Sequence, residues 1–187
     1  FSKLAVAVFG AYFKVQSMAF MPVFGLNNGM IPIISYNYGA QKPDRMKRTM
    51  KLGVMVGCSI MVFCLAIMQV FPGQILKIFD ATDEMLLMGI PAVRIMSTAF
   101  IFAGFSVTCS GMFQAVGKGV YSMIVSMARQ LFVILPVAYF LSKAMNSVNG
   151  VWAAFPIAEV FSVIISTIFL LRGYKKIVKP MESVQRD

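Results

Sequence analysis

Long uncharged runs, separated by short charged segments, dominate the hydrophobic pattern of this chain. No charged residue occurs in residues 15–41, 52–76 or 95–117. A helix that spans a bilayer needs about 20 mostly apolar residues, and each run is long enough. The helix of a soluble domain rarely stays apolar on every face over such a length. The pattern therefore predicts an all-α integral membrane protein.

Five spans are predicted, at about residues 4–38, 52–72, 88–115, 119–142 and 149–171. The first is longer than a bilayer requires, so we expect it to tilt, kink or project beyond the membrane. Its second half contains Gly25, Gly29 and Pro32, where we expect a bend. Residues 72–87 form a short amphipathic stretch, as in an outer interface. Residues 1–172 should thus form a polytopic helical bundle, and residues 173–187 a solvated basic tail.

The positive charges orient the predicted bundle. Lys and Arg residues in short loops mark the cytoplasmic side of a membrane. Of the 17 Lys and Arg residues, twelve fall on one side of an alternating topology: five in the 38–52 loop, two in the turn at 116–129, and five in the tail, including Arg186. We expect an external N-terminus and a cytoplasmic C-terminus in the plasma membrane. An external start and the first residue, Phe1, suit a chain whose earlier helices have been removed.

Composition narrows the function classes. The net charge of +10 suits nucleic acid or lipid, but the positive residues sit beside apolar spans. We therefore expect membrane lipids as partners and no nucleic acid, with about 1 kcal/mol of attraction to anionic headgroups per basic residue. The chain has no His, and its three Cys residues lack metal spacing, so we expect no metal and no cofactor. No catalytic arrangement of nucleophile, base or paired carboxylates is visible, which argues against an enzyme.

The first predicted helix has two contrasting faces when projected at about 100° per residue. One face collects mostly small residues that would let neighbouring helices approach closely in lipid: Gly10, Lys14, Ser17, Met21, Gly25, Asn28, Pro32, Ser35 and Gly39. The other collects aromatic residues and two amides: Phe9, Phe13, Gln16, Phe20, Asn27 and Ile34. In one interpretation this second face lines a mostly apolar ligand cavity, with Phe13, Gln16, Phe20 and Asn27 as candidates. In the other, the rings face lipid and the amides bond across helices.

Four charged residues lie inside or at the ends of predicted spans, where charges are costly and usually face a bundle interior. Lys14, Arg94 and Glu159 occupy a similar depth in the outer half. We therefore expect Glu159 to form an ion pair with Lys14 or Arg94. A proton-binding role for Glu159 in coupling is the less favoured alternative. Arg129 lies near the cytoplasmic end, and we expect it to snorkel to the headgroups.

Residues 22–42, PVFGLNNGMIPIISYNYGAQK, resemble the multidrug and toxic compound extrusion (MATE) family. The resemblance is to the second helix of the C-terminal half, which ends in Asn37-Tyr38-Gly39-Ala40 before a basic loop. Residues 150–156, GVWAAFP, are similar to the opening of the family's last helix. The Arg129-Gln130 pair in the fourth span also fits the family.

The resemblance implies that this chain is one part of a transporter that has twelve helices in two lobes around a central cavity. Such proteins export drugs and other organic compounds, often cationic, in exchange for Na⁺ or H⁺. This chain would correspond to helices eight to twelve, so the N-terminal lobe of the same protein would be its missing partner. Some members carry a coupling carboxylate in helix ten, whereas residues 95–115 contain no Asp or Glu. The coupling ion would then bind mainly outside this chain. The alternatives are a lipid-linked saccharide flippase of the same superfamily and a non-transporting membrane scaffold.

Overall fold

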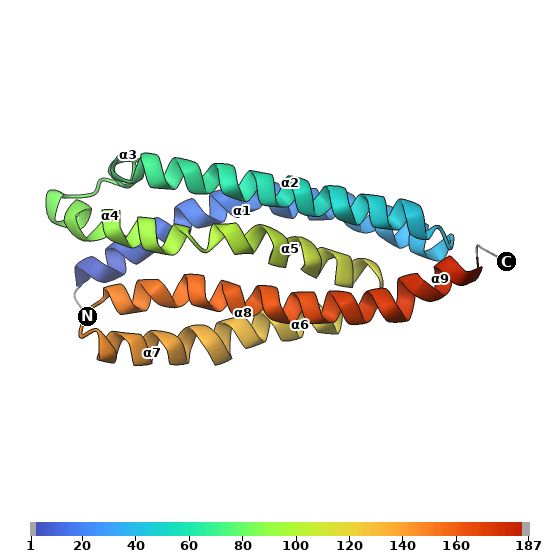
Figure 1. Cartoon of the computed structure of the whole chain (residues 1–187). Helices are drawn as coiled ribbons and strands as arrows, with labels where there is room; N and C mark the ends of the chain where they lie inside the picture. Colours follow the sequence, from blue (N-terminus) through green and yellow to red (C-terminus); the bar gives the residue numbers. More distant parts are fainter. Residues whose placement is uncertain (1–2, 185–187) are drawn as a thin grey trace.

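The computed structural model describes residues 3–184, and within that range every regular element is a helix (Figure 1). The elements are α1 (Lys3–Gly39), α2 (Pro43–Val70), α3 (Pro72–Lys77), α4 (Asp83–Ser97), α5 (Phe100–Ala115), α6 (Gly119–Met127), η1 (Ala128–Ile134), α7 (Leu135–Ala144), α8 (Asn149–Gly173), η2 (Tyr174–Val178) and α9 (Lys179–Val184). The two η segments are π-helical turns inside longer helices. Arg186 and the other tail residues at 185–187 lie outside the described residues, as does Phe1.

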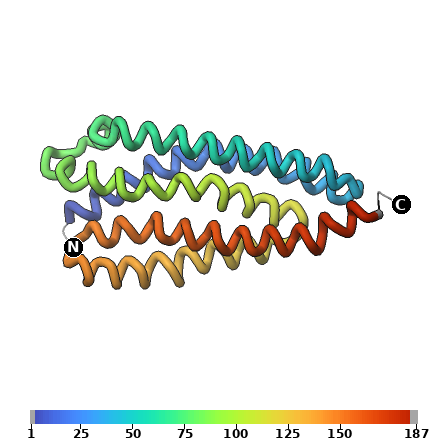
Figure 2. Tube along the Cα trace, in the orientation of Figure 1, coloured from blue at the N-terminus to red at the C-terminus, as the bar shows by residue number. Residues whose placement is uncertain are grey.

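The predicted all-α membrane bundle is confirmed. Four helical segments of residues 3–184 are long and apolar enough to cross a membrane, and there are five if α4 and α5 together form one broken span. The long helices run along a common direction, with the start of α1 at one end of the bundle and α9 at the other (Figure 2). Helix α1 is continuous from Lys3 to Gly39 although it contains Pro22 and Pro32, so a bend at Gly25, Gly29 or Pro32 stays a prediction.

The span predicted at residues 88–115 is broken by a bend of 48° between α4 and α5. Hydroxyl groups compete with the backbone for hydrogen bonds at this point. Ser97 donates to the carbonyl of Arg94, and Thr98 donates to the carbonyl of Ile95. Gln69 of α2 also donates to the Arg94 carbonyl, at 2.9 Å. Side chains that bond to backbone groups within a helix favour a kink.

Both basic segments are more helical than predicted. Helix α2 already begins at Pro43, a residue type favoured in a first helical turn, so the basic loop residues are part of the helix. Helix α8 continues through η2 and α9 to Val184, where a solvated tail was expected. The described part of this tail is anchored by Val178 and Met181, which are 3% and 5% exposed.

The core is continuous around α1, α2, α4, α5 and the start of α8, and its largest buried side chains include Tyr12, Met61, Phe100 and Trp152. A smaller apolar cluster near the other end joins Met30, Ile34, Met46, Met112 and Val178. Helix α7 packs against α8, and α6 packs against both α5 and α8 (Figure 1). Among the described residues, an open space separates α1 from α6 and η1.

Glycines do bring helices together, but not on the predicted face. All nine residues of the small-residue face of α1 are exposed, and a Cβ placed on Gly10, Gly25 or Gly39 would meet no heavy atom within 4 Å. The close approach lies between α2 and α5 instead. A Cβ on Gly104 would lie 2.9 Å from the Cα of Cys58. On α1 itself, the Ser35 hydroxyl donates to the Ala115 carbonyl of α5 at 2.7 Å, and close packing along the rest of the small-residue face stays a prediction.

Candidate functional site

A hollow with a volume of about 620 Å³ lies between α1 and the α6–η1 segment, with α5 and α8 as its floor. The cavity candidates Phe13, Gln16, Phe20 and Asn27 all line it. The other helices contribute Ser106, Ser110 and Gln114 from α5, Ser122 and Ser126 from α6, Arg129 and Gln130 from η1, and Phe155, Glu159 and Ser162 from α8. The volume is in the range of ligand pockets, about 300–1,000 Å³. That these residues bind a substrate stays a prediction.

Asn27 bonds across helices, as one interpretation of its face expects, while ligand binding at this face stays a prediction. It lines the hollow, and its side-chain amide also donates to the backbone carbonyl of Val107 on α5, at 2.9 Å. Gly111 makes room for it, because a Cβ there would come within 2.8 Å of the Asn27 Cγ. Asn27 thus fixes the rotation of α1 relative to α5 and holds the aromatic face of α1 toward the hollow.

Several polar atoms around the hollow are buried without a hydrogen-bond partner among the described residues. They are Gln16 Oε1, Asn27 Oδ1, Ser106 Oγ, Arg129 Nε and Glu159 Oε2. A buried polar group that makes no hydrogen bond costs about 1–3 kcal/mol. Four of the five atoms are oxygens, and because all five are buried, a ligand in the hollow could reach them only after a side-chain movement.

One ion pair lies in the wall of the hollow, between the guanidinium of Arg129 and the carboxylate of Glu159. The Glu159 side chain is 9% exposed and that of Arg129 is 27% exposed. Arg129 belongs to η1, where a wider π-turn interrupts the helix of the fourth span. π-turns inside helices are frequent at functional sites. Here the turn carries the residue that contacts α8.

The predicted partners of Glu159 were wrong, as was the predicted snorkelling of Arg129. Lys14 lies on the exposed face of α1, with its ammonium 5.8 Å from the ring centre of Phe79. Arg94 is exposed on α4. Counting residues along the predicted spans placed Lys14, Arg94 and Glu159 at a similar depth in the membrane. Which of them form an ion pair also depends on how each helix is rotated about its axis. Glu159 points toward η1, and there it meets Arg129.

An aromatic cluster closes one end of the hollow, where α1 meets the start of α8. The rings of Phe9 and Phe13 pack edge to face at 4.7 Å, and Phe9 stacks on Trp152 at 5.9 Å. Phe155, one helical turn before Glu159, packs against Phe9 at 5.7 Å. The ion pair therefore lies next to aromatic surface rather than in a wholly polar environment.

Comparison with known proteins identifies the family. Residues 1–140 match the MatE family model. The chain is 26% identical over 153 residues to the multidrug export protein MepA of Staphylococcus haemolyticus, covering 82% of this chain and 33% of that protein. It is 26% identical over 174 residues to MepA of Staphylococcus saprophyticus, covering 92% of this chain and 38% of that protein.

Solved structures of similar fold cover nearly the whole chain. The MATE multidrug transporter DinF-BH superposes with a TM-score of 0.81 at 32% identity, over 91% of this chain and 38% of that protein. An outward-facing MATE family transporter superposes with a TM-score of 0.84 at 20% identity, over 95% of this chain and 39% of that one. The chain spans about a third of the length of the curated relatives it matches. With three quarters of its residues inside the family model and its helices arranged as in these transporters, the chain belongs to the MatE family, the multidrug and toxic compound extrusion family.

Proposed function

We propose that this chain is the C-terminal share of a secondary-active exporter, which moves drugs and other organic compounds, often cationic, outward across the plasma membrane in exchange for Na⁺ or H⁺. The observation that carries the proposal is the hollow of about 620 Å³ with aromatic walls, unpartnered oxygens and one ion pair. The matched relatives named multidrug export proteins support it. The N-terminal lobe of the same protein would complete the hollow on the exposed side of α1.

The lining suits bulky organic cations for two physical reasons. Aromatic faces such as those of Phe13 and Phe20 attract cations by about 0.5–2 kcal/mol, depending on desolvation. Glu159 Oε2 is buried without a partner among the described residues, and a rotation of its side chain toward the hollow would let it accept from a cationic group or another hydrogen-bond donor. Because Arg129 balances the charge of Glu159, neutral compounds also fit without an uncompensated charge beside them.

The flippase alternative is less well supported. A pyrophosphate-bearing substrate calls for a strongly cationic cavity. Among the described residues that line the hollow, the charged side chains are one arginine and one glutamate. We therefore favour export of organic cations and neutral compounds over lipid-linked saccharide transport.

Efflux measurements on the full-length protein test the proposal. In cells that lack their own exporters, we expect its expression to accelerate loss of a fluorescent organic cation such as ethidium. Phe13→Ala combined with Gln16→Ala should slow this efflux by about three- to tenfold, because both a cation–π face and a hydrogen-bond acceptor are lost. Met18→Ala is the matched control: it lies on the same helix, is 66% exposed and does not line the hollow.

Two results would contradict the proposal. If the full-length protein reaches the membrane in normal amounts but no efflux is measured, the alternative of a non-transporting membrane scaffold is supported. If the double variant and Met18→Ala export the cation equally fast, the hollow is not part of the transport path. Repeating the assay without Na⁺, and again with the proton gradient collapsed, identifies the coupling ion.

A further inference from the structure

Two basic segments that lie far apart in the sequence meet at one end of the bundle. One is the start of α2, and the other is the helical extension formed by the end of α8, η2 and α9 (Figure 1). They carry exposed cations that we refer to together as the basic end: Lys42, Arg45, Arg48, Lys51, Arg172, Lys175, Lys176 and Lys179.

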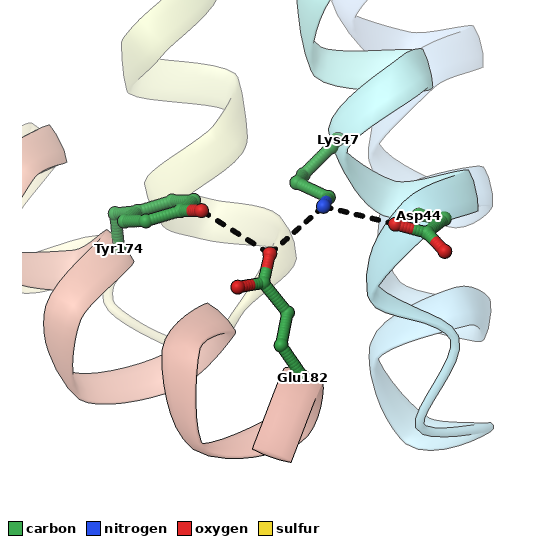
Figure 3. Close-up of polar contacts among 4 residues, drawn as sticks. All are labelled: Asp44, Lys47, Tyr174 and Glu182. Carbon is green, nitrogen blue, oxygen red and sulfur yellow. Dashed lines mark hydrogen bonds and ion pairs between the residues drawn. The ribbon is translucent and has the colours of Figure 1, made fainter. Parts of the chain in front are cut away.

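Among residues 3–184, the exposed cations of this end outnumber its acidic residues, Asp44 and Glu182. Asp44 and Glu182 both contact Lys47, at 2.9 and 2.8 Å from its ammonium, and the hydroxyl of Tyr174 donates to Glu182 at 3.1 Å (Figure 3). These contacts join α2 to α9. Within residues 3–184, no ion pair connects any cation of the basic end to a carboxylate. The surface therefore keeps a strong positive charge.

An apolar slot of about 160 Å³ opens at the same place, between α2, the end of α5 and the α8–η2 junction. Its walls include Met46, Met50, Met112, Phe113, Ile177 and Val178. Among the described residues that line it, the polar side chains are those of Lys47 and Tyr174. Flexible methionine side chains let such a slot adapt to an irregular apolar chain.

We infer that the slot and the basic end together form a binding site for one anionic phospholipid, whose phosphate contacts the cations while the upper part of an acyl chain enters the slot. Charge complementarity selects the occupant. A zwitterionic lipid would fill the slot but leave the cations without a matching charge. A soluble polyanion would match the cations but leave the slot unfilled. Basic pockets between membrane helices are known to bind anionic headgroups.

The depth of the slot is consistent with this ligand. Met50 lies one helical turn beyond Lys47 toward the middle of the bundle, and Leu170 lies one turn inward of Tyr174. With a rise of about 1.5 Å per residue, the slot reaches about 5 Å below the polar groups. A headgroup held at the helix ends would therefore place its first methylene groups between these side chains.

Native mass spectrometry of the purified full-length protein tests the site, with phosphatidylglycerol or phosphatidylcholine added to the detergent. We expect one phosphatidylglycerol molecule to be retained in preference to phosphatidylcholine. Lys175→Gln, Lys176→Gln and Lys179→Gln together should lower the affinity for phosphatidylglycerol by about a hundredfold, because each basic residue near a membrane surface contributes about fivefold. The control is Lys77→Gln with Arg94→Gln, which removes exposed cations from α3 and α4 at the other end.

A second variant separates a built site from diffuse attraction. Gly173 lines the slot, and a Cβ on it would meet no heavy atom within 4 Å. Gly173→Leu adds a branched apolar side chain to the lining without a clash at its Cβ, so we expect it to narrow the slot and lower phosphatidylglycerol retention to the level of phosphatidylcholine. Equal retention of the two lipids by the unaltered protein overturns the inference, as does undiminished phosphatidylglycerol binding by Gly173→Leu. Neither readout requires transport, so failure of the proposed export function would leave this test intact.

Discussion

Replacing Arg129 with Met is expected to lower the free energy of unfolding by about 3–5 kcal/mol, because removing one partner of a buried ion pair leaves the other charge uncompensated. The carboxylate that would be left is that of Glu159, whose side chain is 9% exposed. Its second oxygen already has no partner among the described residues. We also expect the full-length protein with this substitution to lose efflux of a fluorescent cation.

A double variant distinguishes the structural role of this pair from its role in transport. Arg129→Met with Glu159→Gln removes both charges, so neither charge is left buried without its partner. We therefore expect its melting temperature in detergent to recover most of the loss, while efflux of cations stays low because the hollow has lost its carboxylate. Arg94→Met is the matched control, since Arg94 is exposed and changes at such sites usually stay within about 0.5 kcal/mol. If the double variant is no more stable than Arg129→Met alone, the two charges are not coupled.

The membrane architecture could be predicted because it depends on sequence length and polarity alone. Uncharged runs such as residues 52–76 identify spans without knowledge of their neighbours. The aromatic and amide face of α1 was likewise visible, since about 3.6 residues per turn fix which side chains of one helix share a face. Phe13, Gln16, Phe20 and Asn27 do line one hollow.

Contacts between helices could not be predicted, because they depend on how each helix is rotated about its axis. Residue counting placed Glu159 level with Lys14, but packing turned it toward Arg129. The other walls of the hollow are also marked in the sequence, by the spacing of polar residues. Polar residues recur every four positions on α5 and again from α6 into η1: Ser106, Ser110 and Gln114, then Ser122, Ser126 and Gln130. Polar residues at helical spacing within apolar spans mark the faces that avoid lipid.

The small residues of α1 share one face, but the sequence alone does not show which helix would pack against that face. Its residues are exposed in the structure, so a close neighbour along most of this face would have to lie outside residues 3–184. In the proposed exporter that neighbour is the rest of the same protein. Close packing within the chain depends instead on glycines of α2 and α5, which lie inside long apolar runs where no face stands out.

Among the glycines of α2 and α5, Gly104 has the closest contact with backbone atoms of another helix, and this leads to a second large expected effect. Gly104→Ala should destabilise the protein by about 1–3 kcal/mol, in the range of overpacked cores. The added Cβ would lie 2.9 Å from both the Cα of Cys58 and the carbonyl oxygen of Gly57, and 3.1 Å from the Cys58 nitrogen. All three are backbone atoms of α2, so no side chain can rotate away. The two helices must separate, and the apolar contacts along them are lost.

Two further alanine substitutions test whether the loss of stability comes from contact with backbone atoms. At Gly53, the atoms that a Cβ would meet belong to the side chains of Met30 and Thr108. Because methionine can adopt another rotamer, Gly53→Ala should cost less than Gly104→Ala. At Gly173 there is open space, so alanine should be neutral or stabilise the helix by up to about 1 kcal/mol. Melting temperatures of the three purified variants should therefore fall in the order Gly173→Ala, Gly53→Ala, Gly104→Ala. If Gly104→Ala melts as high as Gly173→Ala, then α2 and α5 are not held together by direct backbone contact at this position.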